Sequence, residues 1–354
     1  MTVYITDARR TPVGVKGGIF STVGAAELAA PVLAELHAAA SFEVDEVILG
    51  NVTGPGGNIA RLSALLAGLP VTVPGLTIDR QCSSGLEAIR LGAALIQSAQ
   101  AETVLAGGCE SSSTSPRPEK AVFSPASIGD PEMGLAAEHL AEKKGISRMK
   151  QDDYTLLSYS RYEQSVLCGR FQQEMVSVDG LTQDEAAIKQ RPIAKMVPRA
   201  KAVFKQGGTV TALNSSAFND AACAVTMTNR KQEGLAVVAS AVAGADPNLP
   251  AASPVPAIEK LLQQTGLAVR DIDVWEINEA FAVKIVHISN ALSIPLNKIN
   301  PDGGGIALGH PYGASGAMLV LRLLYGMRER RETYGIAAVG SAGGIGVAML
   351  FKRV

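Results

Sequence analysis

The sequence predicts an α/β fold built from two similar halves, and two observations support this. Short strand-like segments alternate with apolar helical segments, which is typical of parallel sheets covered on both faces. One order of strand, helix and strand also occurs twice, about 230 residues apart, with Ser84 and Ser315 each near the start of the helix. Each copy alone would leave an apolar face exposed, so we expect the two copies to pack together as duplicated α/β halves.

The individual elements follow from local patterns of apolar and β-branched residues. The first copy contains predicted strands at 47–51, 76–79 and 104–108 and a helix at 84–96. The second contains predicted strands at 274–278 and 335–340 and a helix at 318–324. Between the copies, helical periodicity is present at 134–144 and 151–171, and a strand pattern resumes at 208–212.

These patterns divide the 354 residues into three parts. We expect residues 1–114 and 203–242 to form the first half, residues 243–354 to form the second half, and residues 115–202 to form an inserted loop domain that is mostly helical. Insertions of this size in a compact domain usually serve as lids or binding loops. The inserted segment is therefore expected to contribute to a site.

Composition and charge exclude several classes of partner. The chain has 32 Lys and Arg against 33 Asp and Glu, so its net charge of −1 lacks the summed field that binding to nucleic acid or an anionic membrane usually needs. No apolar run approaches the roughly 20 residues of a membrane span. The opening segment contains Asp7 and no apolar run, so we expect no signal peptide.

The four cysteines show neither CxxC spacing nor neighbouring histidines; they are Cys82, Cys109, Cys168 and Cys223. We therefore expect no metal site and no disulfide framework. Reduced thiols are typical of the cytoplasm, and the protein is expected to be cytoplasmic.

Cys82 is a candidate nucleophile because it follows a predicted strand and directly precedes the start of a helix at Ser83-Ser84-Gly85. A thiol in that place lies at the positive end of the helix dipole, which lowers its pKa and favours the thiolate. The alternative is that Cys82 is a small buried apolar residue, as isolated cysteines often are.

His310 lies in a segment of unusually small residues, 303–316, and Pro311 restricts the backbone directly after it. A histidine held by rigid and small neighbours is suited to general acid and base chemistry near neutral pH. Asn278 follows the predicted strand at 274–277, where it could hold a water molecule or orient a carbonyl, or simply cap a helix. The glycine-rich turn at 340–346 exposes N–H donors that could form an oxyanion hole, although most such turns are structural.

Together these four elements supply what acyl transfer through a thioester requires. Cys82 and His310 open equivalent helices of the two halves and are expected to meet near the pseudo-twofold axis. Asn278 and the turn at 340–346 follow strand ends, where open α/β sheets bind their ligands. A thiol nucleophile, an activating imidazole and oxyanion donors would then converge on one site.

The motifs around these residues resemble those of the thiolase family over nearly the whole chain. The similar segments are Ala8–Gly14, Gln81–Leu86 (with Ser83 where the family usually has Gly), Gly107–Ser111, Asn278–Ala282 and Gly309–Gly316. The resemblance implies a five-layer α/β/α/β/α fold with a loop domain and a role in lipid metabolism. It also implies coenzyme A thioesters as substrates, without a permanently bound cofactor.

The resemblance assigns a role to each candidate site residue. It implies an acetyl-CoA C-acetyltransferase type of reaction, in which Cys82 becomes acylated and His310 activates it. His310, with a water held by Asn278, would bind the thioester oxygen, and the N–H groups of Cys82 and Ala342 would form a second oxyanion hole. Three further residues would contact substrate, Ser216 at the pantetheine chain and Met133 and Phe281 at the acyl pocket.

The chain also departs from the family pattern. The last family signature begins with a second cysteine, the acid/base for the attacking acyl-CoA, but here Gly340 stands at that position and Ser341 follows it. Neither is a base at neutral pH, so we expect acylation of Cys82 to survive and the Claisen or thiolysis half-reaction to be impaired. The alternatives are an acyl-CoA hydrolase, transfer to another nucleophile, or a homologue that binds CoA thioesters without catalysis.

Two smaller departures bear on assembly and specificity. Residues 111–134 are fewer than usual where the family carries a tetramer-forming loop, and this predicts a homodimer. Glu132 stands where many biosynthetic members have histidine, which leaves the preferred acyl group open.

Overall fold

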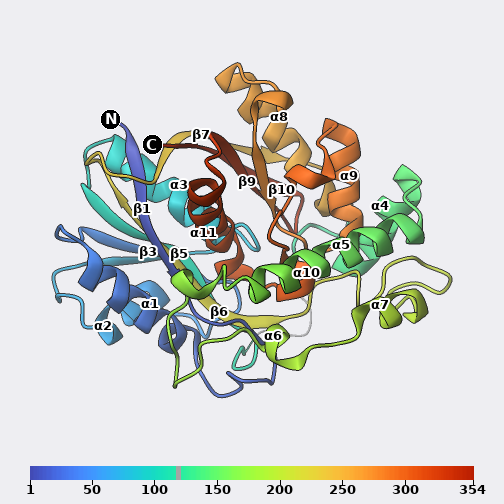
Figure 1. Ribbon diagram of the computed structural model, residues 1–354, viewed down its shortest axis with the longest axis horizontal. Coiled ribbons are helices and arrows are strands. Elements are labelled where there is room, and N and C mark those ends of the chain that lie inside the picture. Colours follow the sequence, from blue (N-terminus) through green and yellow to red (C-terminus); the bar gives the residue numbers. More distant parts are fainter. Residues whose placement is uncertain (117–120) are drawn as a thin grey trace.

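A mixed sheet of ten strands runs through the computed structural model, which describes residues 1–116 and 121–354 (Figure 1). The strand order is β4-β3-β5-β6-β1-β7-β10-β9-β8, and the short β2 pairs with β6. The strands are β1 (Val3–Arg10), β2 (Gly14–Val15), β3 (Glu46–Gly50), β4 (Gly75–Ile78), β5 (Thr103–Ser111), β6 (Asn219–Thr228), β7 (Leu235–Gly244), β8 (Val274–Ile277), β9 (Tyr334–Ser341) and β10 (Ile345–Arg353).

Helices cover both faces of this sheet and also lie between its two halves. They are α1 (Ala25–Ala39), α2 (Ile59–Leu66), α3 (Ser84–Gln97), α4 (Met133–Lys144), α5 (Arg148–Leu167), α6 (Glu185–Lys189), α7 (Ile193–Met196), α8 (Pro254–Thr265), α9 (Ala282–Leu292), α10 (Gly305–Leu308) and α11 (Tyr312–Arg330). Helices α1 and α2 pack on the strands of the first half, and α8 packs on those of the second. Helices α3 and α11 contact strands of both halves and form the middle layer (Figure 1). The predicted α/β fold of duplicated halves in five layers is confirmed.

The two halves share one strand ladder. Val3–Ile5 of β1 pairs antiparallel with Leu235–Val237 of β7, and the other edge of β7 pairs with β10 along its whole length. The predicted boundary between residues 242 and 243 falls inside β7. The domain limits proposed from the sequence remain a prediction.

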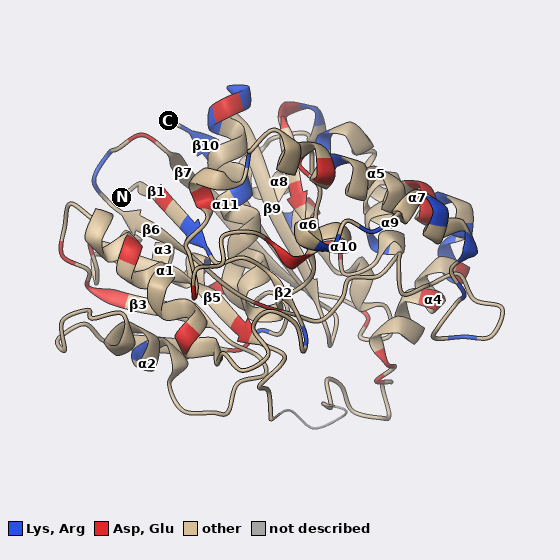
Figure 2. Cartoon of the chain, turned by 60° about the horizontal axis from the view of Figure 1, so that its bottom comes forward, with Lys and Arg blue, Asp and Glu red and all other residues tan. Residues whose placement is uncertain are grey.

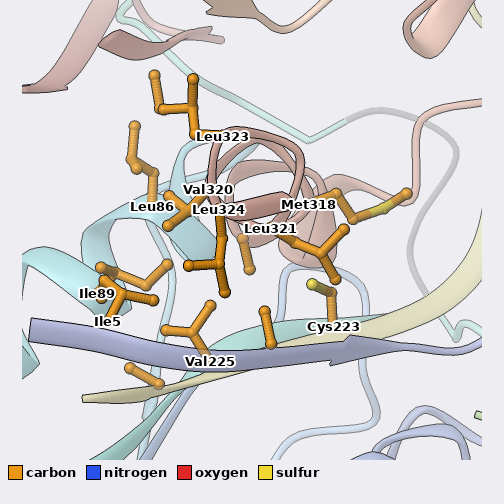
Figure 3. Close-up of a cluster of buried hydrophobic side chains, with 14 of the residues drawn as sticks. Ile5, Leu86, Ile89, Cys223, Val225, Met318, Val320, Leu321, Leu323 and Leu324 are labelled. Atoms are coloured by element: carbon orange, nitrogen blue, oxygen red, sulfur yellow. The ribbon is translucent and has the colours of Figure 1, made fainter. Parts of the chain in front are cut away.

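The largest buried apolar cluster fills the space between the middle helices and the sheet. Figure 3 shows Leu324 of α11 pointing toward Val225 and Leu321 pointing toward Cys223, with Ile89 of α3 near Ile5, whereas Leu323 points away from these strands. Fully burying a leucine or isoleucine side chain contributes about 1.5–3 kcal/mol to folding. The cluster thus holds the N-terminal ends of α3 and α11 in fixed places against the strands.

The strand predicted at 208–212 is wrong. The N–H groups of Thr209 and Val210 donate instead to the carboxylate of Glu138, at 2.8–2.9 Å, and the N–H of Thr211 donates to Asn214 Oδ1 at 2.7 Å. Because side chains take these backbone donors, the segment forms only an isolated bridge between Thr211 and Ala202, and β6 begins only at Asn219.

The inserted segment contains α4 to α7 with irregular connections, as its composition predicts, and residues 117–120 of it lie outside the described part of the chain. A fully buried ion-pair network ties it to β1, because Arg10 bonds to Glu174 and to Asp184, each at 2.6 Å. Lys and Arg alternate with Asp and Glu along the helices, in keeping with the net charge (Figure 2). Among the described residues, no helix has the length and apolar character needed to span a bilayer.

Candidate active site

A cavity of about 390 Å³ lies where the N-terminal ends of α3 and α11 meet. Six of the predicted site residues line it, namely Cys82, His310, Ala342, Ser216, Met133 and Phe281. Asn278 reaches the same place through His310, whereas Gly340 and Ser341 are not among the lining residues. A volume of this size is typical of a pocket for a small organic ligand.

Cys82 occupies a sharp turn between β4 and α3. Gln81 just before it has a left-handed backbone (φ of 51°), and Asp79 holds that conformation by accepting from the N–H of Gln81 at 2.7 Å. Ser84 completes the turn, because its hydroxyl accepts from Arg80 N at 2.8 Å and donates to Gln81 O at 2.6 Å. The Cys82 residue is 9% exposed, at the helix N-terminus that the sequence predicts.

Small residues allow the two central helices to approach each other closely. A Cβ added at Gly316 would lie 2.3 Å from the backbone nitrogen of Leu86, and one added at Gly85 would lie 2.5 Å from the carbonyl oxygen of Gly313. These backbones are therefore in direct contact, with no room for a side chain between them. This contact brings Cys82 and His310 to one cavity although the sequence places them in different halves.

The imidazole of His310 is buried and held from both of its nitrogens. Nδ1 lies 2.6 Å from Ser315 Oγ, and Nε2 lies 3.3 Å from Nδ2 of Asn278. Because the amide Nδ2 of Asn278 can only donate, Nε2 accepts, and the ring proton belongs on Nδ1, where it donates to Ser315. Burial, together with the charge of Lys284, lowers the pKa of His310 to about 3, so the ring is neutral near pH 7.

The residue that follows Asn278 in the chain, Glu279, is a buried carboxylate with three side-chain donors. Glu279 accepts from Tyr154 Oη at 2.5 Å, from Ser158 Oγ at 2.7 Å and from Asn300 Nδ2 at 2.7 Å. The alternative that Asn278 caps a helix is wrong, because α9 begins at Ala282 and its cap residue is Phe281. The motif contained Glu279, but only its tertiary contacts reveal its supporting role.

The two positions of the expected second cysteine face away from the cavity. The Ser341 hydroxyl is fully buried and bonds to Ser83, at 2.6 Å to Oγ and 2.9 Å to N, so it fastens the Cys82 turn to the end of β9. A Cβ at Gly340 would lie 2.7 Å from Ser253 Oγ and 2.7 Å from Pro254 Cδ. Neither position offers an acid or base group to a ligand in the cavity.

The remaining cysteines lie elsewhere. Cys109 and Cys223 are buried on neighbouring strands β5 and β6, where burial raises the pKa of each thiol far above its ordinary value. Cys168 is exposed at the end of α5. Of the four cysteines, all within the described ranges, Cys82 alone lines the cavity.

Two polar residues at the site were missed in the sequence. Ser315 lies in the first turn of α11, and its hydroxyl contacts the imidazole of His310 directly. Lys284 is not among the predicted site residues, although a lone lysine within the otherwise apolar run 282–286 is an unusual pattern for a helix that is buried on most sides. That charge pattern was the signal that could have found it.

The duplicated α/β fold, with a cysteine and a histidine from different halves at one cavity, places the chain in the class of acyltransferases built on two similar halves. The family models make the assignment specific. The thiolase N-terminal domain matches residues 3–231 and the thiolase C-terminal domain matches residues 232–353. The chain belongs to the thiolase family and is an acyltransferase of that family.

Relatives of the chain match it along its whole length. It is 50% identical over 361 residues to YhfS of Bacillus subtilis, covering 99% of each chain, and 38% identical over 378 residues to VraB of Staphylococcus aureus strain MRSA252, covering 99% of this chain and 98% of that one. Both are provisionally named acetyl-CoA C-acetyltransferases. The crystal structure of the Bacillus anthracis acetyl-CoA acetyltransferase superposes with a TM-score of 0.93 at 34% identity, covering 100% of this chain and 99% of that one.

Proposed function

We propose that the protein transfers acetyl groups from acetyl-CoA by a ping-pong reaction through an acyl-Cys82 intermediate. The observation that carries the proposal is that Cys82 and His310, from opposite halves, line the same cavity. In the first step the sulfur of Cys82 attacks the thioester carbonyl, a new C–S bond forms, and the bond to the CoA sulfur breaks. The departing CoA takes up one proton, so that CoA is released as a thiol.

The surrounding residues divide into oxyanion donors and cavity walls. We assign one oxyanion site to His310 with Asn278: when a substrate oxygen replaces the contact between Nε2 and Asn278, the ring proton would lie on Nε2 and Ser315 Oγ would donate to Nδ1. The N–H groups of Cys82 and Ala342 are assigned to the other site. Met133 and Phe281 form apolar wall near the acyl group. Ser216 lies on the same wall, where its hydroxyl donates to the carbonyl of Ala280 at 3.2 Å, and it is proposed to meet the pantetheine chain.

The proposal is tested by the covalent intermediate. After incubation of the purified protein with acetyl-CoA, peptide mass spectrometry is expected to find one acetyl group on Cys82, because this is the cysteine that lines the cavity. Cys82→Ser is expected to abolish the label, whereas the matched Cys168→Ser variant at an exposed position keeps it. A label on another cysteine, or none, would contradict the proposal.

We further propose that the second half-reaction, carbon–carbon bond formation or thiolysis, is impaired in this protein. The supporting observation is that Gly340 and Ser341 present no side-chain base to the cavity. The same observation supports two other fates for the acyl group, hydrolysis by water or transfer to a different nucleophile. Release of CoA from acetyl-CoA without formation of acetoacetyl-CoA would identify one of these fates.

A homodimer is proposed from an exposed apolar surface at the edge strand β4. Leu62, Leu65 and Leu66 of α2 project there beside Val71 and Leu76, and Val71 is 77% exposed. Strand β4 ends the strand order, so its outer edge is available to pair with the same strand of a second copy. Such pairing would cover both the strand edge and the leucines.

The dimer is tested by sedimentation of the purified chain. We expect twice the chain mass of 36.7 kDa, and we expect Leu76→Lys to shift the protein toward monomer because it places a charge in the paired edge. The control is Val238→Lys on β7, at a residue that is 43% exposed against 40% for Leu76 and is separated from β4 by four strands. A monomeric or tetrameric wild type would contradict the proposal.

Cytoplasmic location and a role in lipid metabolism remain predictions.

A further inference from the structure

Lys284 is a buried cation beside the site that the proposed reaction does not use. It lies in the first turn of α9, is 1% exposed, and is surrounded in sequence by apolar residues. Its Nζ donates one long hydrogen bond of 3.5 Å to the carbonyl oxygen of Gly340, and within the described ranges no carboxylate forms an ion pair with it. Burying an ammonium costs several kcal/mol unless an opposite charge compensates it, and a helix N-terminus adds to the cost.

The ionisable groups that act on Lys284 are those of the site itself. Burial lowers the pKa of Lys284 to about 8, and the negative charge of a Cys82 thiolate acts in the opposite direction. Lys284 in turn helps to lower the pKa of His310. Hydrogen bonds connect Lys284 to the Cys82 turn. Gly340, whose carbonyl accepts from Lys284 Nζ, precedes Ser341, and the Ser341 hydroxyl accepts from the N–H of Ser83, the residue after Cys82, at 2.9 Å. Lys284 therefore lies beside the turn that carries Cys82.

We propose that the ammonium of Lys284 is the counter-ion of a Cys82 thiolate, so that the proton of the resting nucleophile resides on Nζ and His310 stays neutral. The inference rests on the proposed function, since it takes Cys82 as the nucleophile. His310 is a poor place for that proton, because an imidazolium would be a second buried cation next to the ammonium. A thiolate and an ammonium, by contrast, neutralise each other in the same low-dielectric space.

In this assignment Lys284 is a positioning residue, because it stabilises the negative charge on Cys82 and does not itself react with the substrate. In the resting enzyme the proton has moved from Sγ of Cys82 to Nζ of Lys284, and no other bond changes. Acylation then consumes the negative charge on sulfur, because its electron pair forms the C–S bond. Without the thiolate beside it, the ammonium of Lys284 gives up its proton more readily. That proton passes to the departing CoA thiolate, and CoA leaves as a thiol.

The proposal predicts the pH dependence of alkylation. With iodoacetamide, the wild type is expected to react at a nearly constant rate from about pH 6 to pH 8, because the paired thiol is already ionised there. In Lys284→Met, the Cys82 thiol is expected to have an ordinary pKa of about 8.5 or higher. It is therefore expected to react about 100-fold more slowly than the wild-type thiol near pH 6. All proteins carry Cys168→Ser, which removes the exposed thiol, and Cys82→Ser measures the background.

Two further variants separate charge from structure. Lys284→Gln keeps a donor for the Gly340 carbonyl without the charge, so it is expected to match Lys284→Met, whereas Lys284→Arg keeps the charge and is expected to preserve the flat profile. A flat profile in Lys284→Gln would overturn the proposal. If Lys284→Met does not fold, Lys284→Gln alone decides the matter.

A measurement on the wild-type lysine needs no substitution at position 284. The ultraviolet absorbance of a thiolate, taken as the difference between the parent protein and its Cys82→Ser variant, is expected to persist well below pH 7. Its disappearance above pH 7 on acidification would overturn the proposal. Neither experiment uses acyl-CoA, so a missing acetyl label on Cys82 would contradict the proposed function without touching this result, and the reverse also holds.

Discussion

Gly316→Ala is expected to lower the rate of Cys82 acetylation by about 10²-fold, because the added methyl group forces apart the two helices that form the site. The new Cβ would lie 2.3 Å from the backbone nitrogen of Leu86, and a backbone cannot give way as a flexible side chain can. Separating α11 from α3 moves His310 away from Cys82. Overpacking of this kind also costs about 1–3 kcal/mol of stability. Stopped-flow release of CoA and thermal unfolding measure the two effects.

The matched control is Gly92→Ala on α3. Its added Cβ would lie 3.1 Å from Met227 Sδ and 3.2 Å from Val104 Cγ1, which are side-chain atoms that can shift slightly. Alanine is also preferred over glycine within a helix by about 0.5–1 kcal/mol. This variant is expected to keep wild-type acetylation. If Gly316→Ala acetylates as fast as Gly92→Ala, close approach of the helices is not what assembles the site.

Thiolysis of acetoacetyl-CoA is expected to run 10²–10⁴-fold more slowly than acetylation of Cys82 from acetyl-CoA, the range that loss of a positioned general base typically produces. The reason is that Ser341 is committed to Ser83 and Gly340 has no side chain. Pre-steady-state acetylation and steady-state thiolysis on the same preparation measure the ratio. Thiolysis as fast as acetylation would show that another group supplies the base.

Gly340→Cys is expected not to restore thiolysis. Its side chain would point toward Ser253 and Pro254, each with an atom 2.7 Å from the new Cβ, and not toward the cavity. We expect a loss of about 1–3 kcal/mol in stability, shared by the matched Gly340→Ala variant, because both add the same Cβ. A tenfold or larger gain in thiolysis for the cysteine variant alone would contradict this account.

Local patterns predicted strands that are short, apolar and buried, whereas the long strands β6 and β7 were not predicted. The strands predicted at 47–51, 274–278 and 335–340 correspond to β3, β8 and β9 within one or two residues. The helix predicted at 318–324 extends over Tyr312–Arg330, because glycines in its first turns pack closely and weaken the helical pattern in the sequence. The segment 208–212 reads as a strand, yet contacts with the distant Glu138 decide its conformation.

The site residues also divide into those that the local sequence predicts and those that depend on tertiary contacts. Cys82 and His310 carry recognisable chemistry in recognisable local settings, and the sequence predicts both. The arrangement of Gly340 and Ser341 depends on which direction a strand end faces, which the motif cannot show. The importance of Lys284 arises only when a helix from the second half places its charge beside a thiol from the first.

The ladder that joins β1 to β7 has a consequence for the order in which this enzyme matures. The first strand to leave the ribosome pairs with one made more than half a chain later. A nascent chain that already carries Cys82 lacks His310 until most of the second half has been made. Such long-range pairing slows folding, and it leaves the incomplete protein without a competent thiol.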